Sequence, residues 1–113
     1  MSKELKLNIS RTVEATELDD LIFGTGALGF PWWDGAHKTD GGYRFTHTAK
    51  DGAEGTFTGN TWRSNQQIVT AAARFFGEGR GPKDAMFEDL GYLDAAEADT
   101  VLQYAIFREA VFG

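Results

Sequence analysis

Residues 61–77, Thr-Trp-Arg-Ser-Asn-Gln-Gln-Ile-Val-Thr-Ala-Ala-Ala-Arg-Phe-Phe-Gly, contain the change from strand to helix that decides the fold. Ser64, followed three residues later by Gln67, predicts a capping box, in which each side chain binds the backbone N–H of the other residue. Apolar residues then recur at helical spacing up to Gly77, and these are Ile68, Ala71, Ala72, Phe75 and Phe76. The stretch therefore predicts a strand that leads directly into an amphipathic helix.

Upstream of this stretch the sequence alternates with the period of two that is typical of half-buried strands. Residues 4–13 and residues 43–48 each predict one strand. The turn Lys50-Asp51-Gly52 predicts a hairpin, because Asp-Gly readily adopts the positive-φ conformation. The threonine-rich residues 56–63 predict further strand, interrupted by a bulge or a second turn at Gly59-Asn60.

Three more helices are predicted from their caps and periodicity. Thr16 with Asp19 resembles a capping box for a short helix over residues 17–23. Residues 83–90 predict a second short helix. Asp94 and Glu97 predict the cap of the last helix, whose apolar stripe consists of Ala98, Val101, Leu102, Ala105 and Ile106.

The longest stretch without periodicity is residues 24–42, which hold six of the 14 glycines and are expected to form a long loop. Taken together, the order of elements predicts an α+β fold. We expect a small antiparallel sheet of three to four strands with helices packed on one face. The length predicts a single α+β domain over residues 1–113.

The formal net charge of −6 is unevenly distributed along the chain. Residues 1–83 sum to zero, whereas residues 84–113 contain seven acids and one base. Three of these acids, Asp94, Glu97 and Asp99, are attributed to capping and to the dipole of the last helix, and the sharper alternative is an acidic surface for a basic partner. An acidic chain with a balanced body disfavours nucleic acid as a partner, because that affinity depends on Lys and Arg.

Several classes of protein are excluded by what the sequence lacks. The chain has no cysteine, which rules out disulfides, thiolate metal sites and cysteine nucleophiles. No apolar run reaches the roughly 18–20 residues that a membrane-spanning helix needs. The first residues alternate rather than form an apolar signal segment. We therefore expect a cytoplasmic protein without a membrane partner.

The richest candidate site is the run Gly-Phe-Pro-Trp-Trp-Asp-Gly-Ala-His at residues 29–37. Paired tryptophans could stack on a base or a sugar, or anchor a protein partner, because indole offers a large area at low entropic cost. The predicted ligand- or partner-binding residues are Phe30, Trp32, Trp33, Asp34 and His37. The alternative interpretation is that one or both indoles plug the core of the small domain.

No arrangement of residues predicts catalysis or metal binding. The two histidines, His37 and His47, are ten residues apart, which is no recognised ligand pattern, and His47 is expected on an exposed strand face. The G-x-G-x-x-G string at residues 24–29 follows a predicted helix rather than a strand, so the match to a dinucleotide fingerprint is interpreted as accidental. We predict no catalytic residue, no metal and no cofactor, and an enzyme using Asp34 or the histidines is the minor alternative.

The C-terminal run Asp-Ala-Ala-Glu-Ala-Asp-Thr-Val-Leu-Gln-Tyr-Ala-Ile-Phe-Arg-Glu-Ala-Val-Phe-Gly, residues 94–113, resembles the ending of small uncharacterised proteins encoded by bacteriophages of actinobacteria. Those proteins end in an acidic helix and a Phe-x-Glu-x-x-Phe/Tyr-Gly tail, matched here by Phe107, Glu109, Phe112 and Gly113. Arg108 departs from the small residue expected in that tail. Residues 18–33 and 62–76 are similar more loosely. The resemblance implies a phage gene product in the host cytoplasm and no established activity.

These observations lead to two hypotheses about function. The first is a non-enzymatic, phage-encoded protein that binds a host or defence protein. The alternative is a protein that binds or sequesters a small, nucleotide-like molecule with the loop between Trp32 and His37. A homo-oligomer through the C-terminal helix is also expected as an option, because Phe107, Val111 and Phe112 extend its apolar stripe, although these residues could instead dock into the core of their own chain.

Overall fold

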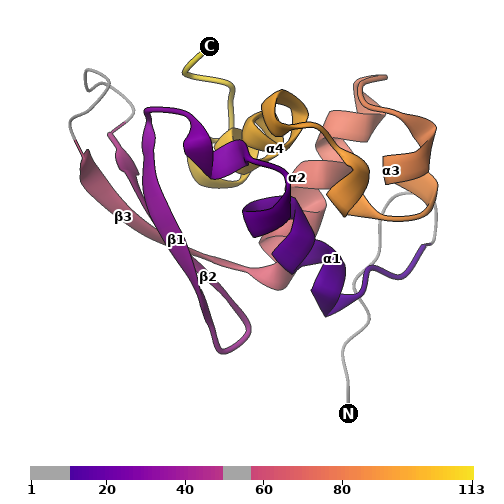
Figure 1. The fold of residues 1–113 in the computed structure, drawn as a ribbon, viewed down its shortest axis with the longest axis horizontal. Helices are drawn as coiled ribbons and strands as arrows, with labels where there is room; N and C mark the ends of the chain where they lie inside the picture. The colour runs from indigo at the N-terminus through magenta and orange to yellow at the C-terminus, as the bar shows by residue number, and fades with distance from the viewer. Residues whose placement is uncertain (1–10, 50–56) are drawn as a thin grey trace.

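The computed structural model describes residues 11–49 and 57–113 of the 113-residue chain. Its elements are, in order, α1 (Ala15–Asp19), η1 (Asp20–Gly24), η2 (Ala27–Gly29), β1 (Trp33–Thr39), β2 (Gly42–Thr48), β3 (Phe57–Ser64), α2 (Asn65–Gly77), α3 (Lys83–Phe87), η3 (Leu90–Tyr92) and α4 (Ala95–Phe107). The three strands form one antiparallel sheet in the order β1-β2-β3. In Figure 1 the sheet lies to the left and the helices gather to the right, with α4 behind η2. The predicted α+β class is confirmed.

One strand lies where a loop was expected. Within residues 24–42, the segment Trp33–Thr39 forms β1 and pairs with β2, so the prediction of an unstructured loop over the whole stretch was wrong. Its residues show no clean alternation because Gly35 and a register shift after Trp33 interrupt the pattern. The strand is therefore specified by its partner strand rather than by its own sequence.

The other predicted strands have mixed outcomes. β2 confirms the strand over residues 43–48, and β3 joins the two threonine-rich runs into one strand, with a register shift opposite His47 and Thr48. The predicted turn at Lys50-Asp51-Gly52 and most of the predicted strand over residues 4–13 lie outside the described residues.

The caps of the two long helices are those predicted from the sequence. Ser64 caps α2 with Gln67 as its reciprocal partner, and Asp94 caps α4 with Glu97. At α1 the expected pair Thr16 and Asp19 was wrong, because the capping box is formed by Glu14 and Glu17.

Glu17 explains this difference at α1. Its carboxylate is buried, forms a salt bridge of 2.9 Å with Arg11 and accepts the backbone N–H of Leu90 at 3.1 Å. Burial raises the pKa of Glu17, but the hydrogen bonds from Arg11, Glu14 and Leu90 outweigh it and leave the pKa below its usual value. The first helix is thus held by contacts to distant residues.

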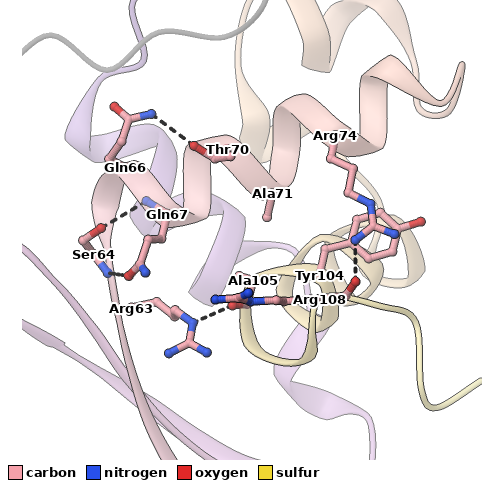
Figure 2. A pocket seen from close by; sticks show the side chains of 10 residues that line it. All are labelled: Arg63, Ser64, Gln66, Gln67, Thr70, Ala71, Arg74, Tyr104, Ala105 and Arg108. Atoms are coloured by element: carbon pink, nitrogen blue, oxygen red, sulfur yellow. Dashed lines mark hydrogen bonds between the residues drawn. The ribbon is translucent and has the colours of Figure 1, made fainter.

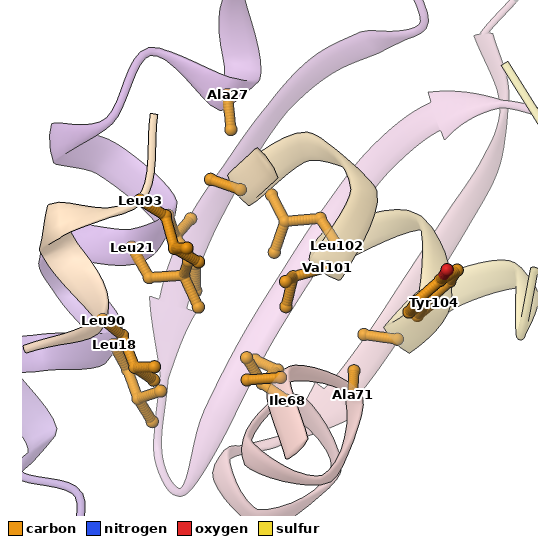
Figure 3. Packing of buried hydrophobic residues seen from close by; sticks show 14 of the residues in the cluster. Leu18, Leu21, Ala27, Ile68, Ala71, Leu90, Leu93, Val101, Leu102 and Tyr104 are labelled. Atoms are coloured by element: carbon orange, nitrogen blue, oxygen red, sulfur yellow. The ribbon is translucent and has the colours of Figure 1, made fainter. Parts of the chain in front are cut away.

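The core lies between the inner face of the sheet and the helices. Figure 3 shows Leu18, Leu21, Ile68, Leu90, Val101 and Leu102 meeting at its centre, from α1, η1, α2, η3 and α4. The sheet contributes Tyr43 and Phe45, which are at most 1% exposed. Since only one face of the sheet packs on helices, the other face remains available for contacts.

Candidate functional site

The structure separates the five predicted binding residues into a buried and an exposed group. Trp32 and Trp33 are 5% and 4% exposed, and Phe30 is half-buried and stacked on Trp32 with 5.1 Å between ring centroids. Asp34 and His37 are exposed on β1. Of the two interpretations of the paired indoles, the structure shows the one in which they plug the core.

Both indoles point at the same carboxylate. The Nε1–H groups of Trp32 and Trp33 each donate to Asp99 Oδ1 at 2.6 Å. Asp99 is only 5% exposed, and burial raises its pKa, partly offset by the hydrogen bonds it accepts from the two indoles and Gln103. The expectation that Asp99 serves the helix start was wrong, because it lies beyond the first turn of α4 and faces the core.

The C-terminal residues close this buried cluster. Gln103 donates to Asp99 Oδ2 at 2.9 Å and accepts the backbone N–H groups of Val111 at 2.7 Å and Phe112 at 2.8 Å. The ring of Phe112 stacks on Trp32 at 5.5 Å. Phe107 lies against Trp33 at 6.3 Å. The terminal aromatics therefore dock into the core of their own chain.

The two histidines are not brought together. His47 is buried, with Nδ1 2.8 Å from the carbonyl of Thr48 and Nε2 2.8 Å from Thr61 Oγ1, so the expectation of an exposed His47 was wrong. His37 pairs with Arg44, on the opposite face of the sheet. Within residues 11–49 and 57–113, no three His, Asp or Glu residues gather closely enough to hold a metal ion.

A different group of side chains occupies the solvent face of the sheet, which we call the outer sheet face and define by His37, Thr39, Arg44, Asn60 and Trp62. The strand register places His37, Arg44 and Trp62 in one row across all three strands. Trp62 is 38% exposed, which is more than either of the other tryptophans. The row presents an indole, a guanidinium and an imidazole on one flat surface.

Two pairs of side chains on this face hold one another in position. The indole of Trp62 lies across Gly42, where an added Cβ would come within 2.7 Å of the ring, and its Nε1–H donates to Thr39 Oγ1 at 2.8 Å. Arg44 Nη1 donates to Asn60 Oδ1 at 3.0 Å. A surface held in this way loses little side-chain entropy on binding a partner.

Sequence reasoning overlooked Trp62 because β3 has no clearly apolar face. In β3 the residues of the same parity, Thr58, Asn60 and Ser64, are polar, and so are Thr61 and Arg63 of the other parity. Side chains alternate between the two faces of a strand, but this alternation does not decide which face carries the indole. The pairing of Trp62 with Arg44 places it on the outer sheet face.

Comparison of the chain with protein-family models, with curated proteins and with solved structures finds no match in any of the three. In the part of the chain that the structure describes, no helix combines the length and the apolar character needed to cross a bilayer.

Proposed function

We propose that this chain is a binding protein without catalytic activity, and that its outer sheet face contacts a protein partner. The observation that carries the proposal is the row of His37, Arg44 and Trp62 across the uncovered face of the sheet. Trp and Arg are the residue types that most often dominate the binding energy of protein interfaces. The separation of the two histidines onto opposite faces supports a binding role over an acid–base one.

The proposal includes the setting in which binding takes place. The resemblance of residues 94–113 to phage proteins supports a bacteriophage gene product that meets a host or defence protein in the host cytoplasm. Self-association through α4 would have to use residues other than Phe107 and Phe112, because both rings pack within their own chain.

Affinity purification from an actinobacterial lysate tests the proposal when it is run on matched variants. We expect a host protein to be retained by the unaltered chain and by Phe87→Ala, which removes a 52% exposed aromatic ring on α3. The same protein should be lost with Trp62→Ala and with Arg44→Glu, and it should bind directly once purified. Equal retention by all variants, or recovery of the chain's own copies alone, would refute the proposal.

A second candidate is supported by the placement of Trp62. Its indole lies against Gly42 and is 38% exposed, so the exposed part of the ring can stack on a planar, nucleotide-like ligand. Titration with adenosine monophosphate should then change tryptophan fluorescence in the unaltered chain but not in Trp62→Phe. The same change in both proteins would exclude the outer sheet face as the ligand site.

A further inference from the structure

A pocket of about 420 Å³ lies between α2 and α4, next to the end of β3 (Figure 2). Its volume falls within the range of small-molecule sites. Three arginines contribute to its wall: Arg63 from the end of β3, Arg74 from α2, and Arg108 from the residue that follows α4. Gln66, Gln67 and Thr70 line the wall formed by α2, and the described residues that line the pocket include no acid.

Two of the arginines are anchored at the C-terminal end of α4. Arg63 Nε donates to the carbonyl of Ala105 at 2.6 Å and Nη2 donates to that of Ile106 at 3.1 Å. Arg74 Nη1 donates to the carbonyl of Arg108 at 2.5 Å, and its guanidinium lies 4.0 Å from the centre of the Tyr104 ring. These contacts hold both guanidinium groups in place before any ligand arrives.

The positive charge of the pocket exceeds what the fold requires. The end of a helix carries only about half a negative charge, which a single cation offsets. Glu78 ion-pairs with Arg74 at 3.3 Å. If Glu78 and Glu109 are each counted in full and the helix end as half a charge, the three guanidinium groups leave a balance of about half a positive charge. Burial and the nearby charge of Arg108 lower the pKa of Arg63, as expected where like charges meet.

Arg108 reaches this place at a conformational cost. It has φ of 67°, and no other non-glycine residue in the described ranges has a positive φ. Glycine is the usual residue at this position of a helix end, since it adopts the left-handed conformation without strain. Strained residues of this kind gather at functional sites. A side chain that costs stability here and points a third guanidinium into a pocket indicates a ligand.

We propose that this pocket binds the phosphate group of a small polar phosphate monoester, through Arg63, Arg74 and Arg108. The three arginines come from three different parts of the fold and line one pocket, so together they offer donors to more oxygens than the two of a carboxylate. The polar body of the ligand lies along Gln66, Gln67 and Thr70 on α2. The site shares no residue with the outer sheet face and does not depend on the proposed protein partner.

Substitution of Arg108 by glycine separates a binding role from a structural one. Arg108→Gly removes one guanidinium and relieves the positive-φ strain, so the melting temperature should rise. We expect calorimetric titration with glycerol phosphate to give a dissociation constant about tenfold or more weaker than for the unaltered chain. Lys83→Gln removes one positive charge from the exposed start of α3, outside the pocket, and should leave phosphate binding unchanged.

A further variant and two further ligands identify the bound group and control for a general effect of charge on binding. Thr70→Glu places a carboxylate in the wall formed by α2 and should abolish binding of glycerol phosphate while all three arginines remain. Inorganic phosphate should bind and acetate should not. The proposal is overturned if glycerol phosphate fails to bind the unaltered chain, if acetate binds as tightly as phosphate, or if Arg108→Gly and Lys83→Gln weaken binding equally.

Discussion

Replacement of Asp99 by alanine tests the account of the buried cluster. Asp99 Oδ1 accepts both indole N–H groups at 2.6 Å, and Trp32 and Trp33 are 5% and 4% exposed. Indole nitrogen is a donor only, so Asp99→Ala leaves two buried N–H groups without an acceptor. Each costs about 1–3 kcal/mol. Gln103 keeps its bond to the carbonyl of Phe112 at 3.0 Å. Removing a buried carboxylate offsets part of the loss, and we expect a net destabilisation of about 2–4 kcal/mol.

Asparagine at this position separates the hydrogen bonds from the charge. Asp99→Asn keeps an oxygen for the two indoles but turns an NH₂ group toward the NH₂ of Gln103. Burial raises the folded-state pKa of Asp99 above 3.8, so its stabilising effect is complete below pH 3.8 and is lost as the pH rises through the folded pKa. Asparagine does not titrate. The difference in free energy of unfolding between the unaltered chain and Asp99→Asn should therefore shrink as the pH rises.

Urea unfolding followed by far-ultraviolet circular dichroism measures these differences without relying on the indoles as probes. Asp34→Ala removes an exposed carboxylate from β1 and serves as the control, with an expected change within about 0.5 kcal/mol. If Asp99→Ala also stays within about 0.5 kcal/mol, the indoles do not depend on Asp99 and the reasoning fails. A pH-independent difference for Asp99→Asn would contradict the raised pKa.

Three further substitutions test other parts of the structure. Gln103→Ala removes the acceptor of the Val111 and Phe112 N–H groups, so hydrogen exchange at these two amides should accelerate. The free energy of unfolding should fall by about 1–3 kcal/mol. Unchanged exchange would argue against a docked C-terminus. Gly59→Ala places a Cβ against the imidazole of His47, whose nitrogens are held by Thr48 and Thr61. The free energy of unfolding, measured by thermal unfolding, should fall by about 1–3 kcal/mol. An unchanged melting temperature would show that the ring can move. Ser64→Ala should cost about 1 kcal/mol in urea unfolding through loss of the α2 cap, and a cost near zero would mean that Gln67 alone suffices.

The features that sequence predicted well are those that a few neighbouring residues determine. The caps at Ser64 and Asp94 satisfy backbone N–H groups three residues away, so the pattern and the structure coincide. β1 is different, because its hydrogen bonds come from β2 and its own residues need not alternate cleanly. The cap of α1 was misplaced for the same reason. Glu17 is selected by Arg11 and by Leu90, 73 residues away in the chain.

The burial of the paired tryptophans explains why the candidate site lies on the sheet rather than in the predicted loop. Their burial depends on an acceptor that lies 66 and 67 residues further along the chain, which no local rule can find. A weaker signal was nevertheless present. Asp99 stands beyond the first turn of its helix, where the dipole no longer favours an acid, and four residues before Gln103 on the face that also carries Leu102 and Ile106.

A polar pair at this spacing on an apolar helix face requires buried donors, and an indole N–H is a donor that needs an acceptor once it is buried. The hydrogen-bond acceptor of the indole N–H therefore distinguishes the three tryptophans of the chain. Trp32 and Trp33 bind one buried carboxylate, whereas Trp62 binds the hydroxyl of Thr39 at the surface. The partner of each indole N–H, rather than the density of aromatic residues along the sequence, therefore identifies the indole that is available for binding.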